Sequence, residues 1–191
     1  ETLIDIGIKP HLIAVSTCYV AGSRRGSAPE ELIDASPFFV NANWQDEVDA
    51  AQRSRQETEA ISRSPENLDK FRSKARNELG AAGNPALASK AEQLRIRWVD
   101  KHLVKAGRSR AASLGFPDAY AYTKAFGELA LLESASDIPI SIVRPSIIES
   151  ALAEPSPGWI RGFRMAEPII ISYAKGLLKE FPGTPEGTLD V

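Results

Sequence analysis

Two short apolar runs stand out from the rest of the chain. The first lies within residues 11–17 and ends in Ser16 and Thr17, and the second covers residues 138–143. Apolar runs of this length, without regular polar alternation, predict strands that are buried on both faces, as in a parallel sheet. We therefore expect two core strands joined by a long connection.

The connection contains a long stretch with the composition of helices. Residues 46–110 are rich in good helix formers, and Gly and Pro at residues 80–85 predict a break between two helices. In the second helix, four apolar residues recur at helical spacing: Leu87, Ala91, Leu94 and Trp98. We interpret this stretch as a helical insertion that packs through one face onto the main body.

A further helix is expected before the second strand. Pro117 and Asp118 suit a helix N-terminus, and residues 119–133 contain no proline. Strand, long crossover, helix and strand in this order are typical of an α/β fold with a parallel sheet. Two strands are too few for such a sheet alone, so we expect its other strands to lie outside these residues or in an arrangement that the sequence pattern does not reveal. After the second strand, the pattern predicts a loop over residues 154–162 and a helix near 168–181.

The length, charge and amino-acid composition of the chain exclude several classes of protein. The chain has 191 residues, 43% of them hydrophobic, with 23 basic and 25 acidic side chains and a net charge of −2. This length suits one domain, and the charge balance argues against a nucleic-acid binder. No apolar run is long enough to span a membrane, and no signal peptide is visible. We expect a cytoplasmic protein, and the single cysteine, Cys18, excludes an internal disulfide.

Tyr120 and Lys124 form the most informative pair of polar residues. At spacing i, i+4 they lie one turn apart on the same helix face. An ammonium beside a phenol lowers the pKa of that phenol, which makes it usable as a general acid or base. Ligands of open α/β sheets bind beyond the carboxyl ends of strands, where Thr17 (or Ser16) and the loop at Pro145 also lie. The alternative is a tyrosine that rests its ring on the core with its hydroxyl in water.

These residues resemble a known family. The sequence of residues 16–20, the pair Tyr120-x-x-x-Lys124 and the dipeptide Arg144-Pro145 resemble the extended short-chain dehydrogenase/reductases. Residues 141–150 and 154–160 are similar to the fatty acyl-CoA reductases in particular. The resemblance covers nearly the whole chain. It implies part of a Rossmann-like doubly wound parallel sheet, with residues 1–191 as the C-terminal part of the reductase domain and the helical insertion at about 46–110.

The resemblance also implies roles for single residues. Tyr120 would be the proton donor, Lys124 would lower its pKa and bind the nicotinamide ribose, and Thr17 would hold the substrate carbonyl oxygen. The nicotinamide ring would be flanked by the residues after the second strand: Pro145, Ser146 and Ile147. The expected reaction is NADPH-dependent reduction of a fatty acyl-CoA to the aldehyde, the alcohol or both.

The chain departs from the family in one respect. The family's Gly-x-x-Gly-x-x-Gly turn, which holds the coenzyme pyrophosphate, does not occur, and the nearest glycine-rich loop, residues 22–26, has the wrong spacing. We expect the coenzyme-binding half to lie upstream of Glu1. Residues 1–191 alone are therefore predicted to bind NADPH poorly and to be inactive.

Several alternatives stay open. The same machinery would serve a nucleotide-sugar epimerase or dehydratase, and a non-catalytic lipid-binding module could retain the fold. Cys18 is interpreted as a core residue rather than a nucleophile, and His11 and His102 lack the spacing of metal ligands, so no metal is expected. Trp159 could contact a membrane peripherally, line an acyl pocket or be buried.

The second insertion helix carries a run of cations. They could bind CoA phosphates, but we favour a solvated helix face. The cations are Lys90, Arg95, Arg97, Lys101, Lys105, Arg108 and Arg110.

Overall fold

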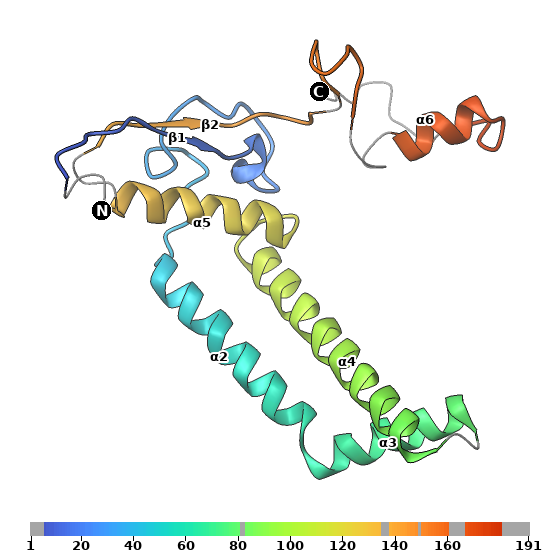
Figure 1. The fold of residues 1–191 in the computed structure, drawn as a ribbon. Coiled ribbons are helices and arrows are strands. Elements are labelled where there is room, and N and C mark those ends of the chain that lie inside the picture. The colour runs from blue at the N-terminus through green and yellow to red at the C-terminus, as the bar shows by residue number, and fades with distance from the viewer. Residues whose placement is uncertain (1–5, 81–82, 135–137, 149, 161–166, 181–191) are drawn as a thin grey trace. The chain divides into compact units, whose positions relative to one another are not determined.

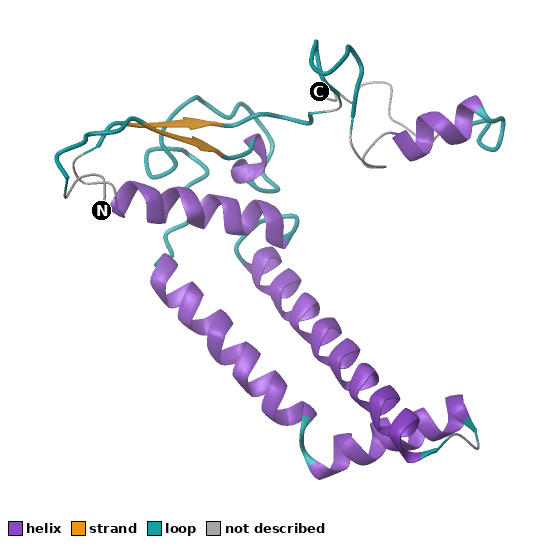
Figure 2. Cartoon of the chain, viewed as in Figure 1, coloured by secondary structure: helices purple, strands orange, loops and turns teal. Residues whose placement is uncertain are grey.

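A computed structural model describes most of the chain, namely residues 6–80, 83–134, 138–148, 150–160 and 167–180. The chain divides into two compact units, residues 1–142 and residues 143–191, and each is described by itself. The helices and strands are shown in Figures 1 and 2 and follow in chain order: β1 (Leu12–Val15), the short 3₁₀ helix η1 (Cys18–Ala21), α2 (Trp44–Ser62), α3 (Pro65–Leu79), α4 (Asn84–Ser113), α5 (Ala119–Ser134), β2 (Ile140–Val143) and α6 (Glu167–Ala174).

The two strands pair with each other as predicted, in parallel. The backbone N–H of Leu12 donates to the carbonyl of Pro139 at 2.9 Å, and His11 Nε2 lies 2.8 Å from the hydroxyl of Ser141. Together with the helices, this two-stranded sheet makes the chain an α/β protein. The described residues form no further strand, and the expectation of a larger sheet stays a prediction.

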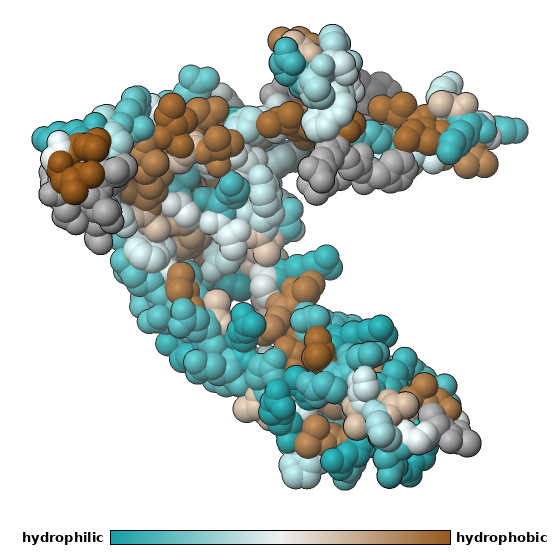
Figure 3. Space-filling model, viewed as in Figure 1, coloured by the Kyte–Doolittle hydropathy of each residue, from teal (hydrophilic) through white to brown (hydrophobic). Residues whose placement is uncertain are grey.

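The prediction that the strands are buried on both faces is wrong for the described chain. Ile13 and Val15 of β1 are 62% and 64% exposed. Figure 3 shows the apolar surface in the part of the first unit that holds the strands. The physical reason is the size of the sheet: with two described strands, its apolar side chains have too few neighbours to cover them.

The core of the first unit joins η1, the end of α4 and α5. Its buried residues are Val20, Ile33, Ala111, Phe116, Ala121, Ala125 and Phe126. Gly22 is required for this packing, because its φ is +74° and a Cβ there would lie 2.7 Å from the carbonyl oxygen of Gly115. As predicted, α5 begins after Asp118, whose carboxylate accepts the N–H of Ala121 at 2.8 Å.

The predicted helical stretch forms three helices rather than two. The break missed by the sequence argument lies at Arg63 and Ser64, where the Ser64 hydroxyl accepts the N–H of Asn67 and Pro65 takes the first helical position. Serine followed by proline is a recognised start signal, so this boundary was visible in the sequence.

The predicted apolar face of α4 is correct, but its partner is not the main body. Leu94 is buried with Phe71 and Ala75 of α3, and Leu87, Ala91 and Trp98 pack around them. The Trp98 ring lies edge-on to Phe71, with centroids 6.1 Å apart. Because α3 folds back along α4, it covers this face itself, and α4 reaches the main core only near its C-terminal end, at Ala111.

The second unit contains one described helix. α6 ends at Ala174, earlier than predicted, and Gly176 follows with a φ of +68°. The preceding loop closes on itself through two backbone hydrogen bonds: the N–H of Ala151 donates to the carbonyl of Trp159, and the N–H of Gly158 donates to the carbonyl of Ala151. Trp159 is 46% exposed, so, of the alternatives for this residue, that of a buried tryptophan is wrong. Residues 161 and 162 of the predicted loop and Phe181 of the predicted helix lie outside the described residues.

None of the helices in the described part of the chain combines the length and the hydropathy that a membrane span requires.

Candidate active site

Lys124 connects α5 to the end of β1. Its Nζ donates a hydrogen bond to the backbone carbonyl of Val15 at 3.0 Å, although 109 residues separate the two in sequence. The same Nζ lies 5.9 Å from the centroid of the Tyr120 ring, within the range of a cation–π contact. The structure therefore holds the lysine ammonium between the phenol and the carboxyl end of the strand.

Tyr120 presents a largely free side chain beside this ammonium. It is 54% exposed, and its hydroxyl makes no hydrogen bond with any residue that the structure describes. A phenol O–H can both donate and accept one hydrogen bond or more. The side chain is thus available to an external group, as a candidate proton donor must be.

Thr17 and Ser16 both lie at the end of β1, directly after the carbonyl that binds Lys124. Thr17 is 3% exposed, and its Oγ1 accepts the N–H of Tyr19 at 3.3 Å, which caps η1. Ser16 is also buried, and its hydroxyl has no partner among the described residues. Thr17 therefore has a structural function already, whereas Ser16 carries a buried hydroxyl that is still uncommitted.

Pro145, Ser146 and Ile147 follow β2 in the chain and are partly buried. They belong to the second unit, which is described by itself. Their expected position beside the nicotinamide ring stays a prediction.

Cys18 differs from its interpretation as a core residue, because it is exposed at the start of η1. Exposure follows from the turn of η1, which buries Val20 instead. Within the described ranges, no three or more His, Cys, Asp or Glu side chains come together in a group that could hold a metal ion.

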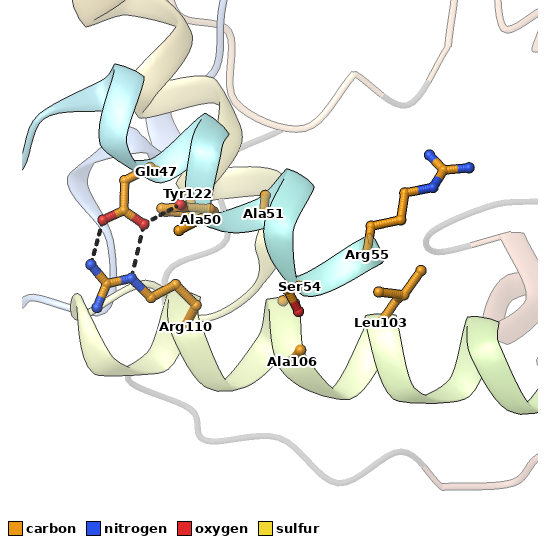
Figure 4. Close-up of a pocket in the computed structure, with 10 residues that line it drawn as sticks. Glu47, Ala50, Ala51, Ser54, Arg55, Leu103, Ala106, Arg110 and Tyr122 are labelled. Atoms are coloured by element: carbon orange, nitrogen blue, oxygen red, sulfur yellow. Dashed lines mark hydrogen bonds and ion pairs between the residues drawn. The ribbon is translucent and has the colours of Figure 1, made fainter. Parts of the chain in front are cut away.

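A polar network that the sequence did not reveal lies on the side of α5 away from Lys124. Tyr122 donates its hydroxyl to Glu47 Oε2 of α2 at 2.7 Å, and Arg110 Nε of α4 donates to the same oxygen at 2.8 Å. A second hydrogen bond joins Arg110 Nη2 to Glu47 Oε1 (Figure 4). Three helices are tied together by this network. No short-range pattern signals it, because Glu47 is 63 and 75 residues from its two partners.

The network shifts the pKa values of its members. Hydrogen bonding to Arg110 lowers the pKa of the Glu47 carboxyl. Burial, followed by the hydrogen bond to Glu47 and its negative charge, raises the pKa of Tyr122 to about 12. Tyr122 is therefore a neutral donor to a carboxylate, and it is unsuited to proton transfer near neutral pH.

Tyr122→Phe should remove a pH-dependent part of the stability. The pKa of Tyr122 is about 12 in the folded chain and near ~10 in an unfolded one. Because the folded value is higher, the stabilisation is fully present below pH ~10 and is lost as the pH rises through about 12. We expect the free energy of unfolding of wild type to exceed that of the variant by about 2 kcal/mol at pH ~8. This difference should shrink towards pH ~12. Urea unfolding followed by circular dichroism measures this.

Tyr173→Phe is the matched control, because Tyr173 is 67% exposed and lies in the second unit. A Tyr122→Phe difference that stays constant from pH ~8 to pH ~12 would contradict the proposed hydrogen bond.

Three of the cations on α4 form ion pairs with carboxylates of the same chain. Arg95 binds Glu59 and Glu92, Arg110 binds Glu47, and Lys90 binds Glu78. For Arg95, which is 4% exposed, the interpretation as part of a solvated helix face is wrong. These three cations are neutralised by carboxylates, which weakens the alternative that this run binds CoA phosphates.

Comparisons with known proteins give a consistent result. The model of an NAD-binding family described as male sterility protein matches residues 5–191. The chain is 32% identical over 183 residues to fatty acyl-CoA reductase 2, chloroplastic, of Arabidopsis thaliana, a match that covers 94% of this chain and 25% of that protein. It is 31% identical over 180 residues to the alcohol-forming fatty acyl-CoA reductase of Simmondsia chinensis, covering 94% and 31%. The chain thus spans a quarter to a third of the length of these relatives.

Proposed function

Because the chain belongs to the male sterility protein family, we propose that it is part of an enzyme that reduces fatty acyl-CoA with NADPH. Its relatives include proteins named fatty acyl-CoA reductase, and one of them is named alcohol-forming. In this proposal, residues 1–191 form the C-terminal part of a Rossmann-like reductase domain, with α2, α3 and α4 as its helical insertion. The single observation that supports the catalytic assignment most directly is the hydrogen bond from Lys124 to Val15.

Lys124 and Tyr120 of α5, beside the end of β1, suit the ribose end of a nicotinamide cofactor. The Lys124 ammonium has three donors, of which Val15 takes one. Its remaining donors and the free hydroxyl of Tyr120 match the hydroxyl groups of a ribose. The proposal assigns Pro145, Ser146 and Ile147 to the flank of the nicotinamide ring. It assigns no residue to the pyrophosphate, because the chain has no Gly-x-x-Gly-x-x-Gly turn.

In the proposed reaction, the protein places the thioester and supplies a proton. NADPH, when bound, provides the hydride for the carbonyl carbon of the acyl group. Tyr120 donates its phenolic proton to the carbonyl oxygen as negative charge develops there. Lys124, held in place by Val15, stabilises the phenolate that this transfer leaves. A hydroxyl at the end of β1, from Thr17 or from the uncommitted Ser16, donates a second hydrogen bond to the same oxygen. The carbon–sulfur bond then breaks and CoA leaves as a thiolate, while the Tyr120 phenolate takes the proton back from the oxygen, which gives the aldehyde.

The function is tested with the full-length protein, NADPH and palmitoyl-CoA. We expect oxidation of NADPH together with release of free CoA, and no turnover of nucleotide sugars. A nucleotide sugar turned over in place of palmitoyl-CoA would overturn the proposal in favour of an epimerase or dehydratase. Palmitoyl-CoA that binds without any oxidation of NADPH would point to a lipid-binding module instead.

A further inference from the structure

A cleft of about 440 Å³ lies between α2 and α4 in the first unit (Figure 4). This volume is within the range of roughly 300–1,000 Å³ that is usual for small-molecule sites. Its walls are built mainly from small or apolar side chains on the two facing helices: Ala50, Ala51, Ser54, Leu103, Ala106 and Gly107.

Ion pairs hold the two helices together on both sides of this cleft. Towards one end of α2, Glu47 binds Arg110, and towards the other end, Glu59 binds Arg95 at 2.7 Å. The small residues between these pairs cannot fill the space that the helices leave. The cleft is therefore a consequence of which side chains face each other, and ordinary packing within the described chain does not close it.

The two ends of the cleft differ in charge. At one end, the carboxylate of Glu47 compensates Arg110, so this end offers no free charge to a ligand. At the other end lies Arg55, which is exposed and has no carboxylate partner in the part of the chain that the structure describes. Figure 4 shows Arg55 and the Glu47–Arg110 pair at opposite ends of the row of small residues. An occupant that matches this surface is apolar along its length and anionic at one end.

We propose that this cleft binds a fatty acid, with the hydrocarbon chain along Ala51 and Ala106 and the carboxylate at Arg55. Polar ligands such as nucleotides need several convergent donors and acceptors, and apart from the paired network the lining offers chiefly Ser54 and Arg55. At a rise of 1.5 Å per residue, α2 advances about 12 Å from Glu47 to Arg55, which suits a chain of medium length.

The proposed site is distinct from the candidate active site. Tyr122 borders the cleft, and Tyr120 lies two residues earlier on α5, about 200° away around the helix axis. A fatty acid in the cleft would therefore be on the other side of α5 from Lys124 and the end of β1. Binding here does not depend on the proposed reductase activity.

The first test measures binding of lauric acid to the full-length protein by displacement of a dansyl-labelled fatty acid. Ala106→Phe places a ring in the cleft and is expected to weaken binding about tenfold or more. Ala88→Phe, at an exposed position of the same helix outside the cleft, is the matched control and should leave the affinity unchanged. If Ala106→Phe fails to fold by circular dichroism, Ala51→Leu on the facing helix replaces it.

The second test isolates the charge. Arg55→Gln should weaken laurate about threefold and leave dodecanol unaffected, because only laurate carries the anionic group. Arg53→Gln, at an exposed arginine of the same helix outside the cleft, should change neither. Two results would overturn the proposal: laurate that does not bind, or laurate that binds equally well to Ala106→Phe. Dimers that dissociate in Ala106→Phe without any laurate binding would assign the cleft to a second copy of the chain.

Discussion

Tyr120→Phe is expected to lower the kcat of the full-length protein about a thousandfold, because the variant lacks the proton that the proposed reaction transfers. The substitution itself should leave the fold intact. The side chain is 54% exposed, and its hydroxyl has no described partner that the substitution could orphan. KM should change little, because the phenol acts mainly as negative charge develops in the transition state. Steady-state oxidation of NADPH with palmitoyl-CoA measures both constants.

The control for this prediction is Tyr173→Phe, which removes a hydroxyl from another exposed tyrosine and should keep kcat within about twofold of wild type. Equal activity of Tyr120→Phe and wild type would remove the proton donor from the proposed mechanism. It would also favour the interpretation of Tyr120 as an ordinary surface tyrosine.

Arg95→Ala is expected to give the largest loss of stability, about 3 kcal/mol in the free energy of unfolding. Arg95 is 4% exposed, and its guanidinium donates to Glu59 at 2.7 Å and to Ser62 Oγ at 2.8 Å. Two further hydrogen bonds reach Glu92, and they raise the pKa of Arg95 above its ordinary value. The substitution removes these hydrogen bonds to Glu59, Ser62 and Glu92 and opens a gap between α2 and α4. Urea unfolding at neutral pH measures the loss.

Arg108→Ala is the matched control, because Arg108 lies on the same helix, is exposed and has no ion pair among the described residues. Its effect should stay within about 0.5 kcal/mol. If the two variants were equally stable, the Arg95 contacts would contribute nothing to the packing of α2 on α4.

Much of the local structure could be predicted from residues that are close in sequence. The start of α5 at Asp118 and the shared helix face of Tyr120 and Lys124 follow from capping preferences and from the 3.6-residue turn. The apolar stripe of α4 follows from the same period. The boundary between α2 and α3 is also marked locally, by Ser64 followed by Pro65. The sequence therefore contained this signal, although the boundary was not predicted.

The packing of the helices and the burial of the strands depend on contacts between residues that are far apart in the chain. Periodicity shows that a residue lies on an apolar face but not which element covers it, so α3 could not be chosen as the partner of α4. The apolar composition of β1 indicates a strand, but its exposure depends on how many neighbouring strands exist.

For the candidate site, the sequence by itself determined the types of residue and their spacing: a phenol, an ammonium one turn later, and hydroxyls after an apolar strand. Only the tertiary structure decided that Lys124 binds the carbonyl of Val15, that Thr17 caps η1 while Ser16 stays uncommitted, and that a cleft opens between α2 and α4. The physical reason is that spacing along a helix is set by bonded geometry. A contact across 109 residues depends on the packing of the whole unit.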